Sequence, residues 1–292
     1  MDHRLARLDR VISCVGDLPA LPDIVAQVLS ITEDPSAAMS RISETVQRDP
    51  ALTAKILKVS NSAYYGMKQY VGTLKLALVI LGVWEVRNIV LGISVFERLG
   101  DGRLDSRLTR KLWGHSVRVG GLSKRLGTAL ALGLEGEDFI SGLLHDVGKI
   151  ALIRQLGPGY MRIFKASGGN SEPLCMLEQE TFGFDHADAA AALASHWNLP
   201  QTLGDAMWCH HPSPDRPLAD ARDPTLAALV RIANRAARED FSDPDAPPGP
   251  CCLDAEAWDL FKSARIPDGV EARREMLTSF VVEFEEHSAD GA

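Results

Sequence analysis

The sequence predicts an all-α protein, and three observations support this fold class. Apolar residues recur at helical spacing along most of the 292 residues, for example at positions 21, 24, 25, 28 and 29. The alternating pattern of a half-buried strand is absent, and the Pro and Gly positions are typical of helix ends rather than of hairpins. We therefore expect a helical N-terminal subdomain packed on a second helical bundle.

The first helices have recognisable boundaries. The apolar face in 18–35 predicts a helix that ends at Asp34-Pro35. In 48–66, Asp49 suits an N-cap and Pro50 suits the first helical position, while Asn61 and Gly66 mark the exit.

Two strongly apolar helices are expected to meet near Gly82, within 74–96. This segment is too polar for a membrane span and predicts buried helices instead, because it contains Lys75, Glu85, Arg87 and Asn88.

Composition shifts divide the chain into three parts. Residues 1–105 form the N-terminal helical part, and 106–240 form a second helical block. Residues 241–292 contain a loop rich in Pro and Asp, followed by a helical pair at about 255–264 and 270–287.

Charge and cysteine content narrow the function class. A net charge of −8 argues against a nucleic-acid partner bound by a large basic surface. Five cysteines without a C-x-x-C pair do not make a disulfide framework, and the N-terminus has no signal-peptide pattern. We therefore expect a cytoplasmic protein with no membrane partner.

Histidines are concentrated in the second block, where six of the eight lie between 115 and 211. A His-Asp doublet interrupts the apolar segment 142–152, and a buried carboxylate needs a partner such as an ion. Imidazole and carboxylate ligands suit Fe, Mn, Zn or Ni. We predict a site for one or two divalent ions, with the ligands His115, His145, Asp146, His186, His210 and His211.

Each residue also has an ordinary structural interpretation. His145 is compatible with a hydrogen-bonded core histidine, His186 with a helix start, and the His210-His211 doublet with a polar helix end. Lys149 suits a phosphate contact, a surface position or a partner for a local acid. His196 lies about 80° from His186 around a helix, which predicts a structural role.

Family resemblance sharpens the prediction. "HSVRVGGLSKRLG" and "GLLHDVGKIAL" resemble the first two motifs of the HD phosphohydrolase superfamily, with an HD-GYP-like order of ligands. "LPALPDIVAQVL", "SRISETVQRDPALTAKILKVSNSAYYG" and "HWNLPQTLGDAMWCHHPSP" resemble the HDOD family, the HD-related output domains of bacterial signalling proteins. The resemblance covers about 18–240 and implies an HD-domain-like bundle for 106–240.

Two departures from the hydrolase pattern stand out. Asn234 occupies the place of a metal-binding aspartate, which weakens the case for a second metal. The GYP signature is missing after His210-His211, which weakens the case for cyclic-dinucleotide recognition.

Three functions follow from the resemblance. The leading hypothesis is a metal-binding regulatory output protein that contacts other signalling proteins. The alternative is a metal-dependent phosphodiesterase acting on a nucleotide or cyclic dinucleotide, in which Asp146 and Lys149 would be catalytic. The third hypothesis is a sensor that binds a nucleotide ligand without cleaving it.

Overall fold

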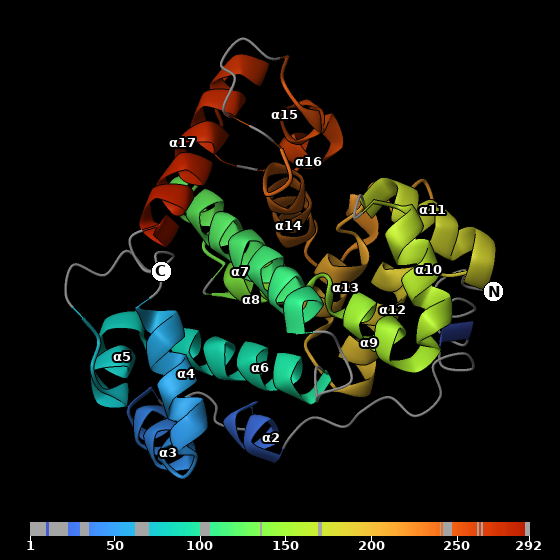
Figure 1. Ribbon diagram of the computed structural model, residues 1–292. Helices are drawn as coiled ribbons and strands as arrows, with labels where there is room; N and C mark the ends of the chain where they lie inside the picture. Colours follow the sequence, from blue (N-terminus) through green and yellow to red (C-terminus); the bar gives the residue numbers. More distant parts are fainter. Residues whose placement is uncertain are drawn as a thin grey trace.

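Helices form all the regular structure in the part of the chain that the structure describes, so the predicted all-α class is confirmed. Figure 1 shows the computed structural model of the chain. It describes residues 10–11, 23–29, 35–61, 70–99, 106–134, 136–168, 171–239, 241, 247–261, 263 and 265–289.

The N-terminal part packs around one long helix. Its helices are α2 (Asp23–Leu29), α3 (Pro35–Gln47), α4 (Pro50–Ser60), α5 (Leu74–Leu81) and α6 (Val83–Leu99). Helices α2, α3, α4 and α5 all contact α6, which lies across this end of the molecule (Figure 1). The predicted cap is present, because the Asp49 carboxylate accepts hydrogen bonds from the backbone N–H groups of Ala51 and Leu52, each 3.0 Å long.

Helices α5 and α6 meet at Gly82, as predicted. Gly82 has φ +86°, a left-handed conformation that glycine adopts without strain, and it turns the chain between the two helices. Together α5 and α6 are long and apolar enough to cross a membrane, but they are bent by 119°. No single helix among the described residues meets that length and hydropathy.

The second part begins with the longest helix. Its helices are α7 (Ser106–Ala129), α8 (Glu137–Leu144), α9 (Val147–Leu156), α10 (Pro158–Ala166), α11 (Ser171–Phe182), α12 (His186–His196), α13 (Gln201–Trp208) and α14 (Pro224–Ala236). Close packing of α7 on α8 needs two glycines, because a Cβ on Gly142 would lie 2.8 Å from the Cα of Gly120. This approach brings the end of α8 against the middle of α7.

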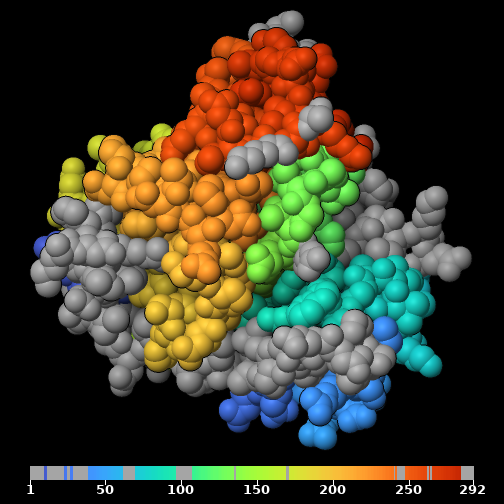
Figure 2. Space-filling view, turned by 180° about the vertical axis from the view of Figure 1, so that it is seen from behind, coloured from blue at the N-terminus to red at the C-terminus, as the bar shows by residue number. Residues whose placement is uncertain are grey.

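The C-terminal segment covers one end of α7 and α14, as the view from behind in Figure 2 shows. It contains α15 (Pro250–Leu253), α16 (Ala255–Asp259) and α17 (Gly269–Ala289), and a short 3₁₀ turn at Leu218–Asp220 lies between α13 and α14. Arg231 of α14 is fully buried and joins these parts. Its guanidinium donates to the carbonyl of Cys209 at 3.0 Å and to the Glu256 carboxylate at 2.7 Å.

Two predicted helix boundaries differ from the structure. The helix expected over 18–35 ends at Leu29, as α2, before the predicted end at Asp34-Pro35, where α3 begins. The helix expected over 255–264 ends at Asp259. Gly66 lies outside the described residues, and the three-part division of the chain stays a prediction.

Candidate metal centre

Asp146 lies at the centre of the histidine cluster. Helix α8 ends at Leu144 and α9 begins at Val147, so His145 and Asp146 occupy the break between them. His145 has no exposed surface, and Asp146 is 2% exposed. The break therefore turns an imidazole and a carboxylate into the interior, where ligands from other helices meet them.

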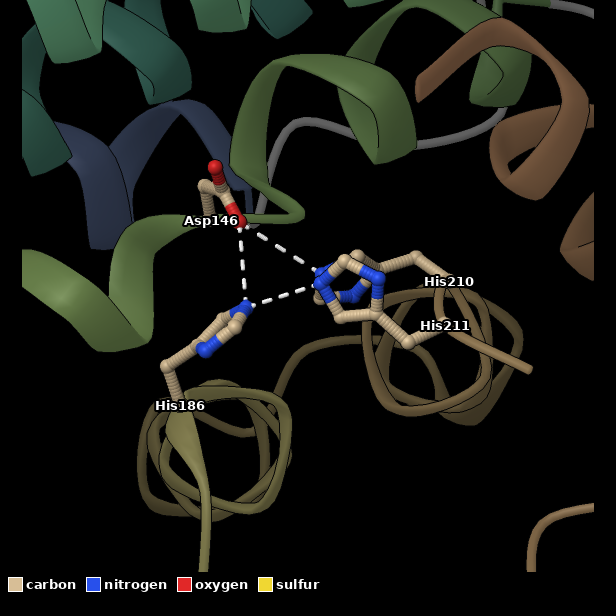
Figure 3. A group of neighbouring side chains, drawn as sticks. All are labelled: Asp146, His186, His210 and His211. Atoms are coloured by element: carbon tan, nitrogen blue, oxygen red, sulfur yellow. Dashed lines mark hydrogen bonds and ion pairs between the residues drawn. The ribbon is translucent and has the colours of Figure 1, made fainter. Parts of the chain in front are cut away.

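One carboxylate oxygen of Asp146 faces three histidines (Figure 3). Asp146 Oδ1 is 3.4 Å from Nε2 of His186 and 3.4 Å from Nε2 of His210. His211 completes the group, with its Nε2 3.0 Å from Nε2 of His186. We call this group the Oδ1 side. His186 is the first residue of α12, and His210 and His211 follow α13.

The other oxygen, Asp146 Oδ2, faces two histidines and two basic side chains. It is 3.4 Å from Nε2 of His145 and 3.6 Å from Nε2 of His115, which comes from α7. Lys149 Nζ approaches it to 2.6 Å and Arg238 Nη2 to 3.4 Å. We call this group the Oδ2 side.

Acceptors behind the rings orient the imidazoles toward Asp146. Nδ1 of His145 is 2.7 Å from the carbonyl of Gly142, and Nδ1 of His210 is 2.6 Å from the carbonyl of Met207. A carbonyl only accepts hydrogen bonds, so each Nδ1 carries the proton and each Nε2 keeps its lone pair. This is the tautomer that a metal ligand needs.

His210, His211 and Asp146 are in the protonation states that bind a metal ion. Burial lowers the pKa of His210 to about 3 and that of His211 well below its usual value. Burial would raise the pKa of Asp146, but its contacts with the neighbouring His145 and Lys149 side chains hold that pKa well below the usual range. Neutral imidazoles and an ionised carboxylate are the forms that bind a divalent ion.

His186 has an additional carboxylate partner behind its ring. Burial alone would lower the pKa of His186, but Glu178 raises it well above the usual value. Glu178 Oε2 is 2.7 Å from Nδ1 of His186 and accepts a 3.0 Å hydrogen bond from its backbone N–H. The hydroxyl of Tyr160 donates to the other oxygen of Glu178. His186 is therefore fixed at both its backbone and its ring.

A second layer of charged residues holds the start of α12. Asp185 caps this helix by accepting hydrogen bonds from the backbone N–H groups of its first turn, and it forms an ion pair with Arg216. The indole of Trp208 donates a 2.8 Å hydrogen bond to Asp188. These contacts join α12 to α13 and so fix His186 relative to His210.

Unpartnered polar atoms show that the cluster fits a metal ion. Asp146 Oδ1, His145 Nε2 and His210 Nε2 are buried and have no hydrogen-bond partner among the described residues. Leaving such atoms unpaired costs about 1–3 kcal/mol each, and a coordinated ion would remove that cost. The ligand atoms of the Oδ1 side lie within 4.8 Å of one another, and so do those of His115, His145 and Asp146. Nitrogen and oxygen donors of this kind suit Fe, Mn, Zn or Ni.

The structure brings all six predicted ligands together from separate helices, and it places Lys149 against Asp146. His196 is exposed at the end of α12, outside the cluster. No sequence motif points to Glu178. Arg238, which follows the end of α14, was also missed, and no sequence motif points to it.

The fold and the buried histidine–aspartate cluster define a helical protein of the HD type. A sequence profile of the HDOD domain matches residues 18–213, which is more than half of the chain. The chain therefore belongs to the HDOD domain family.

A curated relative matches most of the chain. An uncharacterized protein of Treponema pallidum (strain Nichols) is 28% identical over 236 residues, which are 80% of this chain and 44% of that protein. The chain thus spans less than half the length of this relative.

Two solved structures share the fold over almost their whole length. An HDOD domain protein with unknown function from Geobacter sulfurreducens has a TM-score of 0.76 at 22% identity, covering 99% of this chain and 98% of that chain. A proposed phosphohydrolase from Shewanella amazonensis SB2B has a TM-score of 0.70 at 24% identity, covering 97% and 98%.

A third solved structure also has this fold. It is a proposed signal transduction protein from Marinobacter aquaeolei VT8, with a TM-score of 0.69 at 19% identity. The alignment covers 99% of this chain and 66% of that chain. At these identities, the three structures establish the fold alone.

Proposed function

We propose that this protein is a signal-transduction regulator that acts through contacts with other proteins and holds a divalent metal ion at Asp146. One observation carries the metal assignment. The buried Oδ1 atom of Asp146 has no hydrogen-bond partner among the described residues, and it faces the Nε2 atoms of His186 and His210 at 3.4 Å. A divalent ion satisfies the carboxylate and the imidazoles together.

The residues on the Oδ2 side of Asp146 support a regulatory role. Asn234, a neutral side chain, stands where the hydrolase pattern has an aspartate. Lys149 and Arg238 contact Asp146 Oδ2. The signalling relative from Marinobacter has the same fold. A metal that stabilises a binding surface needs no substrate, so the site serves this role without turnover.

Phosphoester hydrolysis is the second candidate, and the exposure of the site favours it. Arg238 is 28% exposed and His115 is 19% exposed, so solvent reaches the edge of the cluster. Lys149 and Arg238 are suited to contacting phosphoryl oxygens. A bound divalent ion would supply a Lewis acid and an activated water at neutral pH.

Elemental analysis followed by an activity assay on the same sample tests both proposals. Purified protein should contain a divalent metal and should not hydrolyse generic phosphodiesters. Asp146→Asn should abolish metal binding with the fold retained. His196→Ala is the matched control, because His196 is exposed, and this variant should keep the metal.

The remaining outcomes separate the alternatives. Metal-dependent turnover that is lost in Asp146→Asn would replace the regulatory role with hydrolysis. A protein without metal, after purification and after incubation with Mn²⁺, would refute the metal centre. Binding of a cyclic or linear nucleotide without cleavage, measured by calorimetry, would make the protein a nucleotide sensor.

A further inference from the structure

We propose that the centre holds a single metal ion, on the Oδ1 side of Asp146, and that the guanidinium of Arg238 takes the place of a second ion on the Oδ2 side. This inference rests on the proposed metal binding and specifies how many ions bind and where.

Arg238 occupies the ligand atoms that a second ion would need. Its Nη2 is 2.9 Å from Nε2 of His115 and 3.4 Å from Oδ2 of Asp146. A guanidinium only donates hydrogen bonds, so the lone pair of His115 Nε2 is directed at Arg238. The His115 imidazole, which a second metal ion would need as a ligand, is therefore already hydrogen-bonded to Arg238.

Asn234 anchors the guanidinium in this position. Its Oδ1 accepts a hydrogen bond from Nε of Arg238 at 3.2 Å, and it lies 3.1 Å from Nε2 of His115. An aspartate here would offer a negative charge to an ion, whereas the amide offers only a neutral acceptor. The substitution therefore removes a ligand charge and supplies a contact for the arginine.

The charge distribution distinguishes the two sides of Asp146. The Oδ2 side already has two cationic side chains, with Lys149 at 2.6 Å and Arg238 at 3.4 Å. A divalent ion added there would be repelled by both cations. The Oδ1 side combines three imidazoles with the unpartnered carboxylate oxygen, and Glu178 places a further negative charge behind His186. Negative charge therefore favours one ion on the Oδ1 side, whereas the two cations repel a second ion from the Oδ2 side.

Metal stoichiometry tests the inference without any activity measurement. Metal-free protein is loaded with excess Mn²⁺, desalted and analysed for manganese per chain, and its electron paramagnetic resonance spectrum is recorded. Wild type should bind one Mn²⁺ and give the spectrum of an isolated ion. The double variant Asn234→Asp/Arg238→Ala restores the carboxylate and removes the guanidinium, so it should bind two ions and show exchange coupling.

A conservative variant provides the matched control. Arg238→Lys keeps the positive charge beside His115 and should still bind one ion. Two ions in this variant would show that charge at position 238 does not exclude the second ion. Folding of every variant is checked by circular dichroism and thermal unfolding.

Failure of the inference is distinguishable from failure of the proposed metal centre. Two coupled ions in wild type would overturn the single-ion assignment and leave the metal centre standing. No ion in wild type would refute the metal centre itself. A folded double variant that still binds one ion would overturn the role given to Arg238. If the double variant does not fold, the wild-type stoichiometry and spectrum alone decide the single-ion assignment.

Discussion

Among the histidines of the candidate metal centre, His186 is held in place by a buried carboxylate, that of Glu178. Glu178 is fully buried and contacts both the ring and the backbone N–H of His186. A carboxylate behind a ligating histidine fixes the ring tautomer and makes the opposite nitrogen a stronger donor. We therefore assign Glu178 a positioning role toward the ion.

Glu178→Gln should weaken metal binding about 10- to 100-fold while the protein stays folded, because the amide removes the negative charge behind His186 but keeps an oxygen acceptor. The measurement is a Mn²⁺ or Zn²⁺ titration against a competing chelator. Glu180→Gln is the matched control, since Glu180 lies on the same helix and is exposed, and it should bind as wild type does. Equal affinities for all three proteins would show that Glu178 serves packing alone.

At the residue scale, the ligands could be predicted from the sequence but their supports could not. The clustering of the histidines around the His-Asp doublet suggests these positions, and their order matches a family pattern that sharpens the prediction. Glu178 could not be identified, because it lies on a neighbouring helix and its spacing from His186 follows no motif. Arg238 could not either, because its contact with His115 joins residues 123 positions apart.

At the scale of elements, the break between α8 and α9 places the centre, and the packing of α9 on α12 joins Asp146 to His186. Gly148, in the first turn of α9, makes this packing tight. A Cβ at this position would lie 1.9 Å from the carbonyl oxygen of His186 and 2.8 Å from the backbone nitrogen of Ala190. Both neighbours are backbone atoms, so rotating a side chain cannot relieve the clash.

Gly148→Ala should therefore separate α9 from α12. We expect a loss of about 1–3 kcal/mol or more in the free energy of unfolding, measured by urea denaturation, together with weaker metal binding. Gly159→Ala is the control, because Gly159 lies within α10 and a Cβ there meets nothing within 4 Å. That change should stabilise the protein by about 0.5–1 kcal/mol. A Gly148→Ala protein as stable as wild type would contradict the packing described for these helices.

Element boundaries were predictable where a local signal sets them. Asp49-Pro50 and Gly82 mark helix ends through capping and a left-handed backbone, and both ends lie where the sequence indicates. The end of α2 at Leu29 was missed, because apolar periodicity alone does not mark it. Pro35, where the helix end was expected, is the first residue of α3. The break at His145-Asp146 has no glycine or proline to signal it, and it follows from tertiary packing.

At the scale of the whole molecule, the metal centre joins helices that are distant in the sequence. Its ligands come from α7, the α8–α9 break, the start of α12 and the end of α13. Helix α6 of the N-terminal part packs on α8 and α9, the helices that flank His145 and Asp146. If the proposed ion is bound, it would stabilise the surroundings of α6 as well as its own ligands. Metal binding would then affect the N-terminal part through the contacts of α6 with α8 and α9.

Removing the metal should lower stability, and the loss should be localised. With free metal at 100 times the dissociation constant, binding contributes about 2.7 kcal/mol, so a chelator should lower the melting temperature by roughly 4 °C for a chain of this length. Asp146→Asn protein should show no such shift, because it has no ion to lose. Hydrogen exchange should report faster opening of α7, α9, α12 and α13 after chelation. Helices α3 and α4 should change little, because they pack chiefly on each other and on α2, α5 and α6. An equal loss of protection along all the helices would contradict a local effect and would mean that the ion stabilises the whole fold. An unchanged melting temperature would mean that these helices stay packed without the ion.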